Sequence, residues 1–479
     1  MDKELDIVII GGGVIGTAIA RELSKYELDI ALIEKESDVG WGTTKANSAI
    51  VHTGYDPKPE SLMARLNVEG ARLFPSICEE LDVPYKKIGS LVLTPHNEGF
   101  KKLEELKERG KINGVTNLEI ITQQKLLEME PNLSRDIKGA LWVKDTAITS
   151  PVELAIAFRE NAEKNGVRFI FNNKVTGFEI EDERIVEVKT DKSSFRTKWI
   201  INAAGVFSDK IARLAGDNSF TITPVKGEYA LFDKEVGNLV NHIIFPLPTE
   251  TTKGILIIPT VDGNLLVGPN EHITTEDDTE VTQEGLEEVL NFAKKECPSL
   301  PLNMIITVFA GLRAKALDRG DFVIEPSQAV RNLINVGGIQ SPGLSSTPGI
   351  ARYVLEILKE EGLELSPKLD FNPERRSIPR FSNLSWEERE RLIEKDPNYG
   401  ELICRCEHVT LGEVIEAIKR GANTLDGIKF RVRAGSGRCQ GGFCGPRLIP
   451  LLAQLLEVPV EEITKKGKDS HLVVGETKE

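Results

Sequence analysis

Residues 5–35, LDIVIIGGGVIGTAIARELSKYELDIALIEK, contain the pattern that decides the fold. An apolar run of strand length is followed by a glycine-rich turn, a segment with alanine and leucine at helical spacing, and a second apolar run. This order predicts a strand, a helix and a second strand that lies parallel to the first. We therefore expect an α/β fold that opens with a βαβ unit.

Three glycines in the turn, Gly11, Gly13 and Gly16, have the G-x-G-x-x-G spacing of dinucleotide-binding sites. The first permits a tight turn, the second lets the backbone approach a pyrophosphate, and the third allows the helix to pack closely on the strand. Glu34 closes the second strand 18 residues after Gly16, where its carboxylate can accept a hydrogen bond from a ribose hydroxyl. Because this carboxylate would repel a 2′-phosphate, the pattern predicts a Rossmann-like domain that binds FAD or NAD rather than NADP.

The composition is that of an ordinary globular protein with several domains: 479 residues, 40% hydrophobic and 28% charged. The formal net charge of −14 argues against nucleic-acid binding, because phosphates are met by lysine and arginine. The sequence has neither a cationic leader nor an apolar run of about 20 residues, so it predicts no signal peptide and no membrane span. We expect a cytoplasmic location, where clustered cysteines serve metals or redox chemistry more often than disulfides.

Four of the six cysteines lie in one C-terminal stretch, with the spacing C-x-C, 32 residues and C-x4-C. Four thiolates can bind zinc or an iron–sulfur cluster, and structural zinc sites favour C-x2-C pairs, which this stretch lacks. Thr410 and Glu413 form a predicted capping box for a helix beside the first pair. Cys78 and Cys297 are expected to be buried apolar residues. The candidate metal ligands are Cys404, Cys406, Cys439 and Cys444.

Several ordered blocks between residues 5 and 360 resemble FAD-dependent oxidoreductases of the D-amino-acid oxidase type, particularly glycerol-3-phosphate oxidases and dehydrogenases. The blocks are the glycine turn, ANSAIVHTG from residue 46, INAAGVFSD from 201, KGEY from 226, TKGILIIPTVDGNLLVGP from 252, FAGLR from 309 and GGIQSPGLSSTP from 337. Many such blocks recur in 2-hydroxyglutarate dehydrogenases. LICRCEHVT and CQGGFCGPR resemble the small [2Fe-2S] module of bacterioferritin-associated ferredoxin. The resemblance implies bound FAD and a [2Fe-2S] cluster.

Changes of pattern along the chain set the predicted domain boundaries. The order of strand, glycine and helix recurs at 198–216, whereas 221–308 is rich in strands of the antiparallel type and 363–398 is charged and dotted with proline. We predict a discontinuous FAD-binding domain, an inserted antiparallel β-rich substrate-binding domain, a linker and a small, mainly α-helical [2Fe-2S]-binding domain. Their respective bounds are 1–85, 145–220 and 305–362; 86–144 and 221–304; 363–398; and 399–479.

The resemblance also implies a catalytic site. His52 would act as the base that removes a hydroxyl proton, and Ser48 would line the pocket beside flavin and substrate. Arg313 and Lys253 match positions that contact the substrate phosphate in the glycerol-phosphate members, and an arginine fork suits an anion. Ser341 completes the predicted substrate site.

The residues that the resemblance places at FAD lie in the glycine turn and in the later blocks. They are Gly11, Gly13, Ile15, Gly16, Glu34, Thr43, Thr44, Asn47, Ser48, Val175, Gly205, Gly343, Leu344 and Ser345. Thr347 and Pro348 have the residue types of an N-cap and a first helical position, so we expect the last helix of this domain to begin there, with its positive end towards the flavin. Ala314 stands where many relatives have proline, which leaves the shape of that loop open.

These features favour an enzyme that oxidises sn-glycerol 3-phosphate to dihydroxyacetone phosphate by hydride transfer to flavin N5. Electrons would leave through the cluster to an electron-accepting flavoprotein or another redox subunit. The basic stretch 427–439 could be a docking face for that partner or a solvated basic strand. One alternative is an L-2-hydroxyglutarate or related 2-hydroxy-acid dehydrogenase. Another is an electron-transfer subunit of a flavoprotein complex with a vestigial substrate pocket. Substrate would not reduce the flavin of such a subunit.

Overall fold

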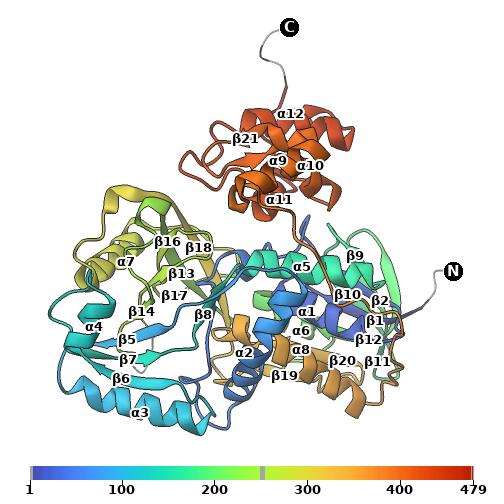
Figure 1. The fold of residues 1–479 in the computed structure, drawn as a ribbon. Helices are drawn as coiled ribbons and strands as arrows, with labels where there is room; N and C mark the ends of the chain where they lie inside the picture. Colours follow the sequence, from blue (N-terminus) through green and yellow to red (C-terminus); the bar gives the residue numbers. More distant parts are fainter. Residues whose placement is uncertain (1–3, 249–253, 476, 478–479) are drawn as a thin grey trace.

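The computed structural model of the chain describes all residues except 1–3, 249–253, 476 and 478–479. It has the mixed α/β fold expected from the sequence. Two bodies, each built on a large sheet, lie side by side, and a small helical module sits against them at the C-terminal end of the chain (Figure 1).

The first body is built on an eight-stranded sheet with a parallel centre. Its strands are β10 (Val175–Glu181), β11 (Arg184–Thr190), β12 (Ser194–Asn202), β1 (Leu5–Ile10), β2 (Ile30–Ile33) and β9 (Arg168–Ile170), with β20 (Leu333–Gly337) on β12 and β19 (Val323–Pro326) on β20. Strands β2, β1, β12 and β20 run parallel, as the opening βαβ pattern predicts. The sheet therefore places the glycine turn at the carboxyl end of β1, beside the ends of its neighbours.

Helices cover this sheet because its strands are apolar on both faces. Ile7 and Ile9 of β1 are fully buried in the cluster that includes the helices, while Val8 and Ile10 face a second buried cluster. Alternate residues of a strand point to opposite faces, so both faces need cover. The helices whose residues join the first cluster are α1 (Val14–Leu23), α2 (Leu62–Glu80), α5 (Pro151–Lys164) and α8 (Gly343–Glu360).

The second body is built on a nine-stranded sheet that is antiparallel apart from one pair. Its strands are β17 (His272–Ile273), β13 (Thr223–Phe232), β16 (Leu265–Gly268), β15 (Leu256–Pro259), β14 (Ile243–Phe245), β5 (Ser90–Thr94), β7 (Gly139–Val143), β6 (Leu118–Thr122) and β18 (Ile305–Lys315). Its helices are α3 (Gly99–Ile112), α4 (Gln123–Met129) and α7 (Gln283–Glu296). A smaller sheet of β3 (Ile50–Val51), β8 (Ala147–Thr149) and β4 (Tyr85–Lys87) lies where the chain passes between the bodies.

The C-terminal module is a small helical unit with its own apolar core. It contains α9 (Trp386–Lys395), β21 (Leu402–Cys404), β22 (Val409–Thr410), α10 (Leu411–Lys419), α11 (Leu425–Val432) and α12 (Gly445–Leu456). The capping box at α10 is confirmed, because Glu413 Oε2 accepts from Thr410 N–H at 2.7 Å and Thr410 Oγ1 accepts from Glu413 N–H at 3.4 Å. Cys78 and Cys297, outside the module, are buried as expected.

The start of α8 corrects the sequence prediction. The helix begins at Gly343, directly after Pro342, and Thr347 and Pro348 lie inside it rather than at its N-cap and first position. The hydroxyl groups of Ser346 and Thr347 donate back to the carbonyl oxygens of Pro342 and Gly343, both at 3.1 Å. Pro348 is the sixth residue of the helix, past the first turn in which N–H groups have no intrahelical partner, so this proline does not mark the helix start.

The basic stretch 427–439 is also corrected, because its first part belongs to helix α11 and its arginines bind this chain's own acidic groups. Thr424 caps that helix, accepting from Gly427 N–H at 2.9 Å. Arg431 pairs with Asp38 of the first body at 2.6 Å, and Arg438 pairs with Asp233 of the second at 2.7 Å. The stretch therefore docks the module on the two bodies instead of offering an open face to a partner.

Two arginines share the carboxylate of Asp38 at the centre of this docking surface. Arg159 of α5 lies 3.0 Å from it and Arg431 of α11 lies 2.6 Å from it, and the side chains are 10%, 2% and, for Asp38, 3% exposed. A second junction joins Arg433 and Arg380 to Asp262 at 2.6 and 2.8 Å. Buried charges of this kind hold their geometry tightly, because breaking a pair leaves an unpaired charge away from water.

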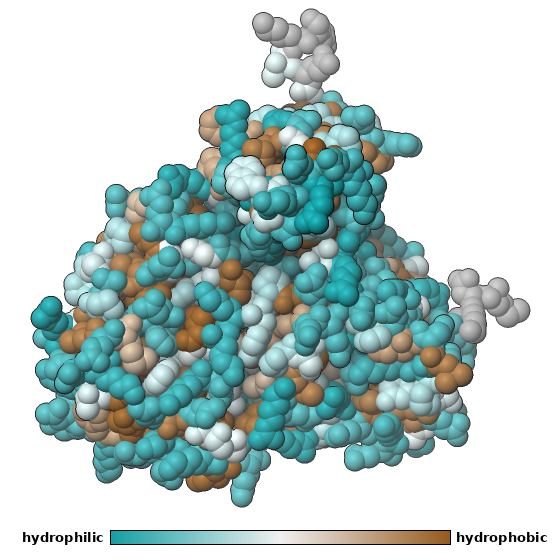
Figure 2. Space-filling model, in the orientation of Figure 1, coloured by the Kyte–Doolittle hydropathy of each residue, from teal (hydrophilic) through white to brown (hydrophobic). Residues whose placement is uncertain are grey.

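The surface of the molecule shows no large apolar belt on the face seen in Figure 2, where apolar residues are scattered among hydrophilic ones. Within the described ranges, none of the helices combines the length and apolar character needed to cross a bilayer.

Candidate functional site

A cavity of about 1040 Å³ lies between the two bodies. Its wall is formed by the glycine turn, the segment 41–52, the ends of β12 and β20, and the face of β18. Most of the predicted site residues line it: Gly11, Gly13, Ile15, Glu34, Thr43, Thr44, Asn47, Ser48, His52, Gly205, Arg313, Ser341, Gly343 and Leu344. Segments far apart in the sequence thus meet at one cavity.

The glycine turn has the backbone geometry that a dinucleotide needs. Gly11 has φ +108°, and a Cβ there would lie 2.5 Å from the carbonyl oxygen of Ala203. A Cβ on Gly16 would collide with the Gly11 carbonyl, so this third glycine serves helix packing and does not line the cavity. Gly13, by contrast, faces the cavity at the start of α1, where helix N–H groups favour a bound phosphate.

Glu34 lies directly after β2 and faces the same cavity. Its carboxylate accepts from Gly12 N–H at 2.5 Å and from Glu36 N–H at 2.9 Å. Burial raises the pKa of Glu34, and these two N–H groups act against that rise. The carboxylate is thereby held at the end of the turn where a ribose would lie.

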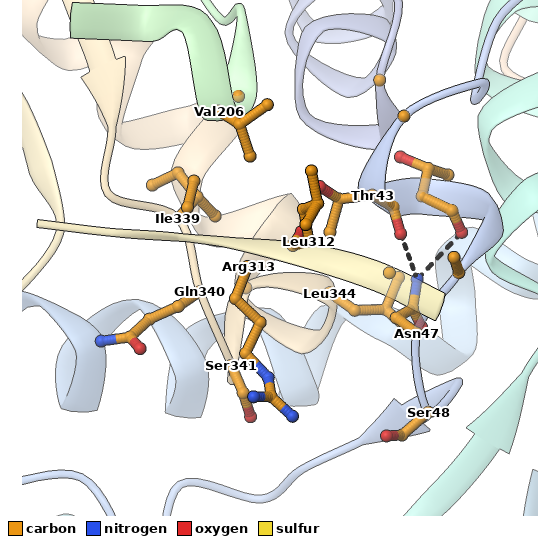
Figure 3. Close-up of a pocket in the computed structure, with 18 of the residues that line it drawn as sticks. Thr43, Asn47, Ser48, Val206, Leu312, Arg313, Ile339, Gln340, Ser341 and Leu344 are labelled. Atoms are coloured by element: carbon orange, nitrogen blue, oxygen red, sulfur yellow. Dashed lines mark hydrogen bonds between the residues drawn. The ribbon is translucent and has the colours of Figure 1, made fainter. Parts of the chain in front are cut away.

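The segment 43–48 supports the opposite end of the turn. Thr44 Oγ1 accepts from Val14 N–H at 3.0 Å, which fixes the segment against the start of α1. Asn47 Nδ2 donates to the carbonyl oxygens of Thr43 and Thr44 at 3.2 and 2.9 Å, the contacts dashed in Figure 3. These bonds shape a short 3-10 turn that presents Ser48 to the cavity.

Besides Gly16, two of the predicted FAD residues lie away from the cavity wall. Val175 is in β10 and is buried in the core of the first body. Ser345 is fully buried in α8, where its hydroxyl donates to Pro342 O and accepts from Asn67 Nδ2, both at 2.9 Å. Asn67 also donates to the carbonyl oxygen of His52 at 2.9 Å. Ser345 therefore braces the strand that carries His52.

Polar side chains gather at the second body's side of the cavity. His52 follows β3, and its ring lies 5.8 Å from the ring of Phe245. Ser48 Oγ lies 3.2 Å from the hydroxyl of Tyr229 in β13. The Tyr229 ring stacks on Phe309 of β18, with centroids 4.8 Å apart. Burial raises the pKa of Tyr229, which keeps its hydroxyl protonated and able to donate.

Arg313 is a guanidinium placed in a largely buried position on β18. Its Nη2 donates to the carbonyl oxygen of Asn270 at 3.3 Å, while the buried Nη1 has no hydrogen-bond partner and stands 3.8 Å from Glu271. Burial lowers the pKa of Arg313, although the group remains a cation because arginine loses its proton only at extreme pH. Figure 3 shows Arg313 and Ser341 at the cavity. An unsatisfied buried N–H is costly, so this site suits an incoming anion.

Sequence reasoning missed Tyr229, and one predicted residue, Lys253, cannot be placed in the structure. Tyr229 lies in the KGEY block, but it becomes a site residue only because β13 pairs with β18 and brings Tyr229 opposite Phe309. No local signal separates it from a core tyrosine. Lys253 falls among residues 249–253, outside the described residues. Ala314 lies within β18, so the chain after Arg313 is a regular strand rather than a loop.

The four clustered cysteines meet between two loops of the module. Cys404 ends β21 and Cys444 directly precedes α12, and both are buried, whereas Cys406 is exposed. Cys406 Sγ lies 3.7 Å from Cys439 Sγ, and the thiols of Cys404 and Cys444 form a second pair. A hydrogen bond from Cys444, with further N–H groups of the backbone, lowers the pKa of Cys404.

This donor set fits a two-iron cluster better than one metal ion. In the part of the chain that the structure describes, no three His, Cys, Asp or Glu side chains gather at a single metal position. The sulfurs instead form two pairs, and [2Fe-2S] clusters are held by four thiolates. Backbone N–H groups directed at Cys404 would also stabilise negative sulfur.

Comparison with known proteins agrees with this geometry. Residues 6–357 match the family model described as FAD dependent oxidoreductase. The chain belongs to this family. Residues 402–454 match the model of the BFD-like [2Fe-2S] binding domain. The protein is thus a flavoenzyme whose cofactors are FAD and a [2Fe-2S] cluster.

Individual relatives cover the chain to different extents. It is 49% identical to a glycerol 3-phosphate dehydrogenase of Caloramator mitchellensis over 99% of both chains. It is 30% identical to the mitochondrial L-2-hydroxyglutarate dehydrogenase of Mus musculus, with 72% of this chain and 87% of the relative covered. The FAD-bound structure of L-alpha-glycerophosphate oxidase from Mycoplasma pneumoniae has a TM-score of 0.75 at 31% identity, covering 79% of this chain and 99% of that one.

Proposed function

We propose that this flavoenzyme oxidises sn-glycerol 3-phosphate to dihydroxyacetone phosphate and passes the electrons to a partner protein. The observation that carries the proposal is the buried Nη1 of Arg313, which makes no hydrogen bond although Glu271 lies 3.8 Å away, at a cavity that also receives His52 and Ser48. A phosphate oxygen would satisfy that N–H and the positive charge together. The full-length likeness to the Caloramator mitchellensis glycerol 3-phosphate dehydrogenase supports the choice of substrate.

In this reaction a C–H bond and an O–H bond of the secondary alcohol are broken to give the ketone. FAD, held by the glycine turn, Glu34 and the segment 43–48, supplies the acceptor for the hydride and its two electrons. His52 removes the hydroxyl proton, since imidazole is the side chain most often used as a general base. The Asn67 bond to the His52 carbonyl keeps the backbone of this base in place.

The other polar residues orient the substrate. Arg313 binds the phosphate, and Lys253, at a matching position in the family pattern, adds a second cation. The Tyr229 hydroxyl and Ser48 lie within reach of each other and can hold the substrate hydroxyl groups. Such positioning converts a bimolecular encounter into a reaction within one complex.

The position of β18 supports a route for the electrons. Val308 lines the flavin cavity, and Ile306, two residues along the same strand, lines a crevice that includes Cys406. Two residues of a strand span about 7 Å, and their side chains point to the same face. This strand, which lines both the cavity and the crevice at Cys406, supports a proposed transfer of electrons from flavin to cluster and on to a redox partner at the exposed Cys406.

The test is an anaerobic titration of the flavin with glycerol 3-phosphate in wild type and in Arg313→Ala. Loss of a charge-assisted hydrogen bond should weaken binding by about 1.5 to 3 kcal/mol, or roughly 10- to 100-fold in the half-saturating concentration. Arg319→Ala is the matched control, because Arg319 pairs with Glu325 away from the cavity. Equal half-saturation in Arg313→Ala and the control would overturn the assignment of the phosphate site.

The same titration separates the alternatives. L-2-hydroxyglutarate also carries a secondary alcohol beside an anion, and several relatives bear the name of its dehydrogenase. Faster bleaching by L-2-hydroxyglutarate than by glycerol 3-phosphate would exchange the proposed substrate for that acid. A flavin that neither alcohol bleaches, but that a redox partner does reduce, would identify an electron-transfer subunit.

A further inference from the structure

One residue of the iron–sulfur module lies at the flavin cavity. Lys466 is the only described residue after Leu344 that lines the cavity. It lies beyond α12, in a turn that the antiparallel bridge between Thr464 and His471 closes. Its neighbours in the cavity wall include Glu36, Trp41 and Lys45, at the end where Glu34 and the glycine turn lie.

This turn is fitted to the loop that follows β2. Ser37 Oγ donates to the carbonyl oxygen of Lys466 at 3.1 Å and accepts from Trp41 Nε1 at 3.0 Å. Gly467 has φ +113°, and a Cβ there would lie 2.9 Å from Ser37 Oγ. The Trp41 ring also contacts Phe430 of α11, with centroids 5.1 Å apart. The close approach therefore needs both the glycine and the docked module.

The other side of the turn is fixed to the module. The Lys465 ammonium pairs with Asp426 at 2.7 Å, and Asp426 N–H donates to the Lys465 carbonyl at 2.8 Å. Leu425 N–H donates to the Thr464 carbonyl at 3.2 Å. These bonds join the turn to the start of α11, so Lys466 can reach the cavity only when the module is docked.

Two lysines that line the cavity here form no ion pair in the described part of the chain. Over the described residues, neither Lys45 nor Lys466 has a carboxylate oxygen within ion-pair distance, whereas Lys465 and Lys35, the neighbouring lysines, each have one. Lys45 lies over the Trp41 ring at 5.1 Å, and burial, then the nearby Lys466, lowers the pKa of Lys45. Asp426 and Glu36 also act on Lys45 and oppose this lowering, but Asp426 pairs with Lys465 at 2.7 Å and Glu36 with Lys35 at 3.5 Å. Two lysines that form no ion pair beside a dinucleotide cavity favour the binding of an anion.

We propose that Lys466 is an FAD-binding residue supplied by the iron–sulfur module and that, with Lys45, it binds the diphosphate of FAD. The module then closes the adenosine side of the flavin site as well as carrying the cluster. FAD binding and module docking are coupled, and each must strengthen the other by the same factor because the coupling is reciprocal. The inference holds for any alcohol that the enzyme oxidises.

The experiment measures FAD affinity directly. Apoprotein of wild type, Lys466→Ala, Lys466→Arg and Lys468→Ala is titrated with FAD, and binding is followed by the quenching of flavin fluorescence. Lys468 is the matched control, an exposed lysine two residues along that does not line the cavity. We expect Lys466→Ala to raise the Kd about tenfold, as for the loss of one charge-assisted contact, with a smaller dependence on salt. Lys466→Arg should restore most of the affinity, and Lys468→Ala should bind as wild type does.

A second measurement tests the reciprocal effect without relying on a variant. Hydrogen exchange of the amides of 464–471 is compared in wild-type apoprotein alone, with FAD, and with FMN, which lacks the adenosine half. FAD should slow exchange in this turn, and FMN should not. An unchanged Kd in Lys466→Ala, or a turn that FMN protects as well as FAD does, would overturn the proposal. Because Lys466 is exposed, the variant should unfold at the wild-type temperature, which excludes misfolding as the cause of weak binding.

Discussion

The flavin cavity and the iron–sulfur site are assembled in opposite ways. The cavity draws its wall from segments spread between Gly11 and Lys466, so its wall is complete only when both bodies and the module are in place. The four cysteines come from two loops of a single small module with its own core. A local site tolerates changes elsewhere in the chain, whereas a site built from distant segments responds to them. Substitutions at each site should therefore show whether FAD binding and cluster content depend on each other.

The largest effect is expected at the local site. Cys404→Ser removes one of four thiolate ligands, so iron and sulfide should fall from about two of each per chain to almost none. Flavin content at saturating FAD should stay at the wild-type level, because no cysteine lies in the described wall of the cavity. Chemical analysis for iron, sulfide and flavin checks both. Cys78→Ala is the control and should keep its cluster; a cluster retained in Cys404→Ser would refute the assignment of this ligand.

The next effect concerns the distributed site. His52→Ala should slow the reduction of the flavin by substrate about 10²- to 10⁴-fold, as expected for the loss of a general base. Stopped-flow bleaching under anaerobic conditions gives the rate. The iron and sulfide contents should be unaffected, because a change at the flavin cavity should not disturb the cluster. A wild-type reduction rate would remove His52 from the proton transfer.

A change at the docking surface should link the sites. Asp38→Asn leaves Arg159 and Arg431 buried without their shared carboxylate, which should destabilise the docked module by about 3 to 5 kcal/mol. Proteolysis within 363–398 should become faster, and FAD should bind more weakly, while the cluster remains. As a control, Asp318→Asn changes an exposed aspartate far from this surface. Equal protease resistance in the two variants would show that the buried pair does not hold the module.

The smallest expected effect is a dependence of module docking on acidic pH. Burial acts to raise the pKa of Asp262, but Arg433 and Arg380 outweigh it and hold that pKa below its ordinary value. A carboxyl group with a lowered pKa in the folded state contributes stability that is complete above about pH 4 and is lost as the pH falls towards the folded pKa. Glu153, which pairs with Arg380, has the opposite effect on this pH dependence, because burial raises its pKa. The module should thus be released more readily below about pH 4, as scattering or proteolysis would detect, and Asp262→Asn should flatten this dependence.

The parts of the molecule that sequence reasoning anticipated are those with local causes. The glycine turn, the capping box at Thr410 and the set of four cysteines each depend on residues close together in the chain. Sequence reasoning did not find Tyr229 and Lys466, because strand pairing and domain docking bring them to the cavity. Arg431 looked like part of a docking face for a partner or of a solvated basic strand, since its acidic partner lies 393 residues away. Charges look unpaired in a sequence whenever their partners are distant.

The pairing of Asp38 with Arg431 also has a consequence for biosynthesis. The carboxylate belongs to the first part of the chain to leave the ribosome, and its second arginine follows 393 residues later. At about 5 to 20 residues per second, this interval lasts roughly 20 to 80 s. Arg159 follows Asp38 by 121 residues, so until Arg431 is made it is the only one of the two arginines that can pair with Asp38, and the adenosine side of the flavin site stays open. FAD can therefore enter the nascent protein before the module arrives, and the last domain to be made closes the site behind it.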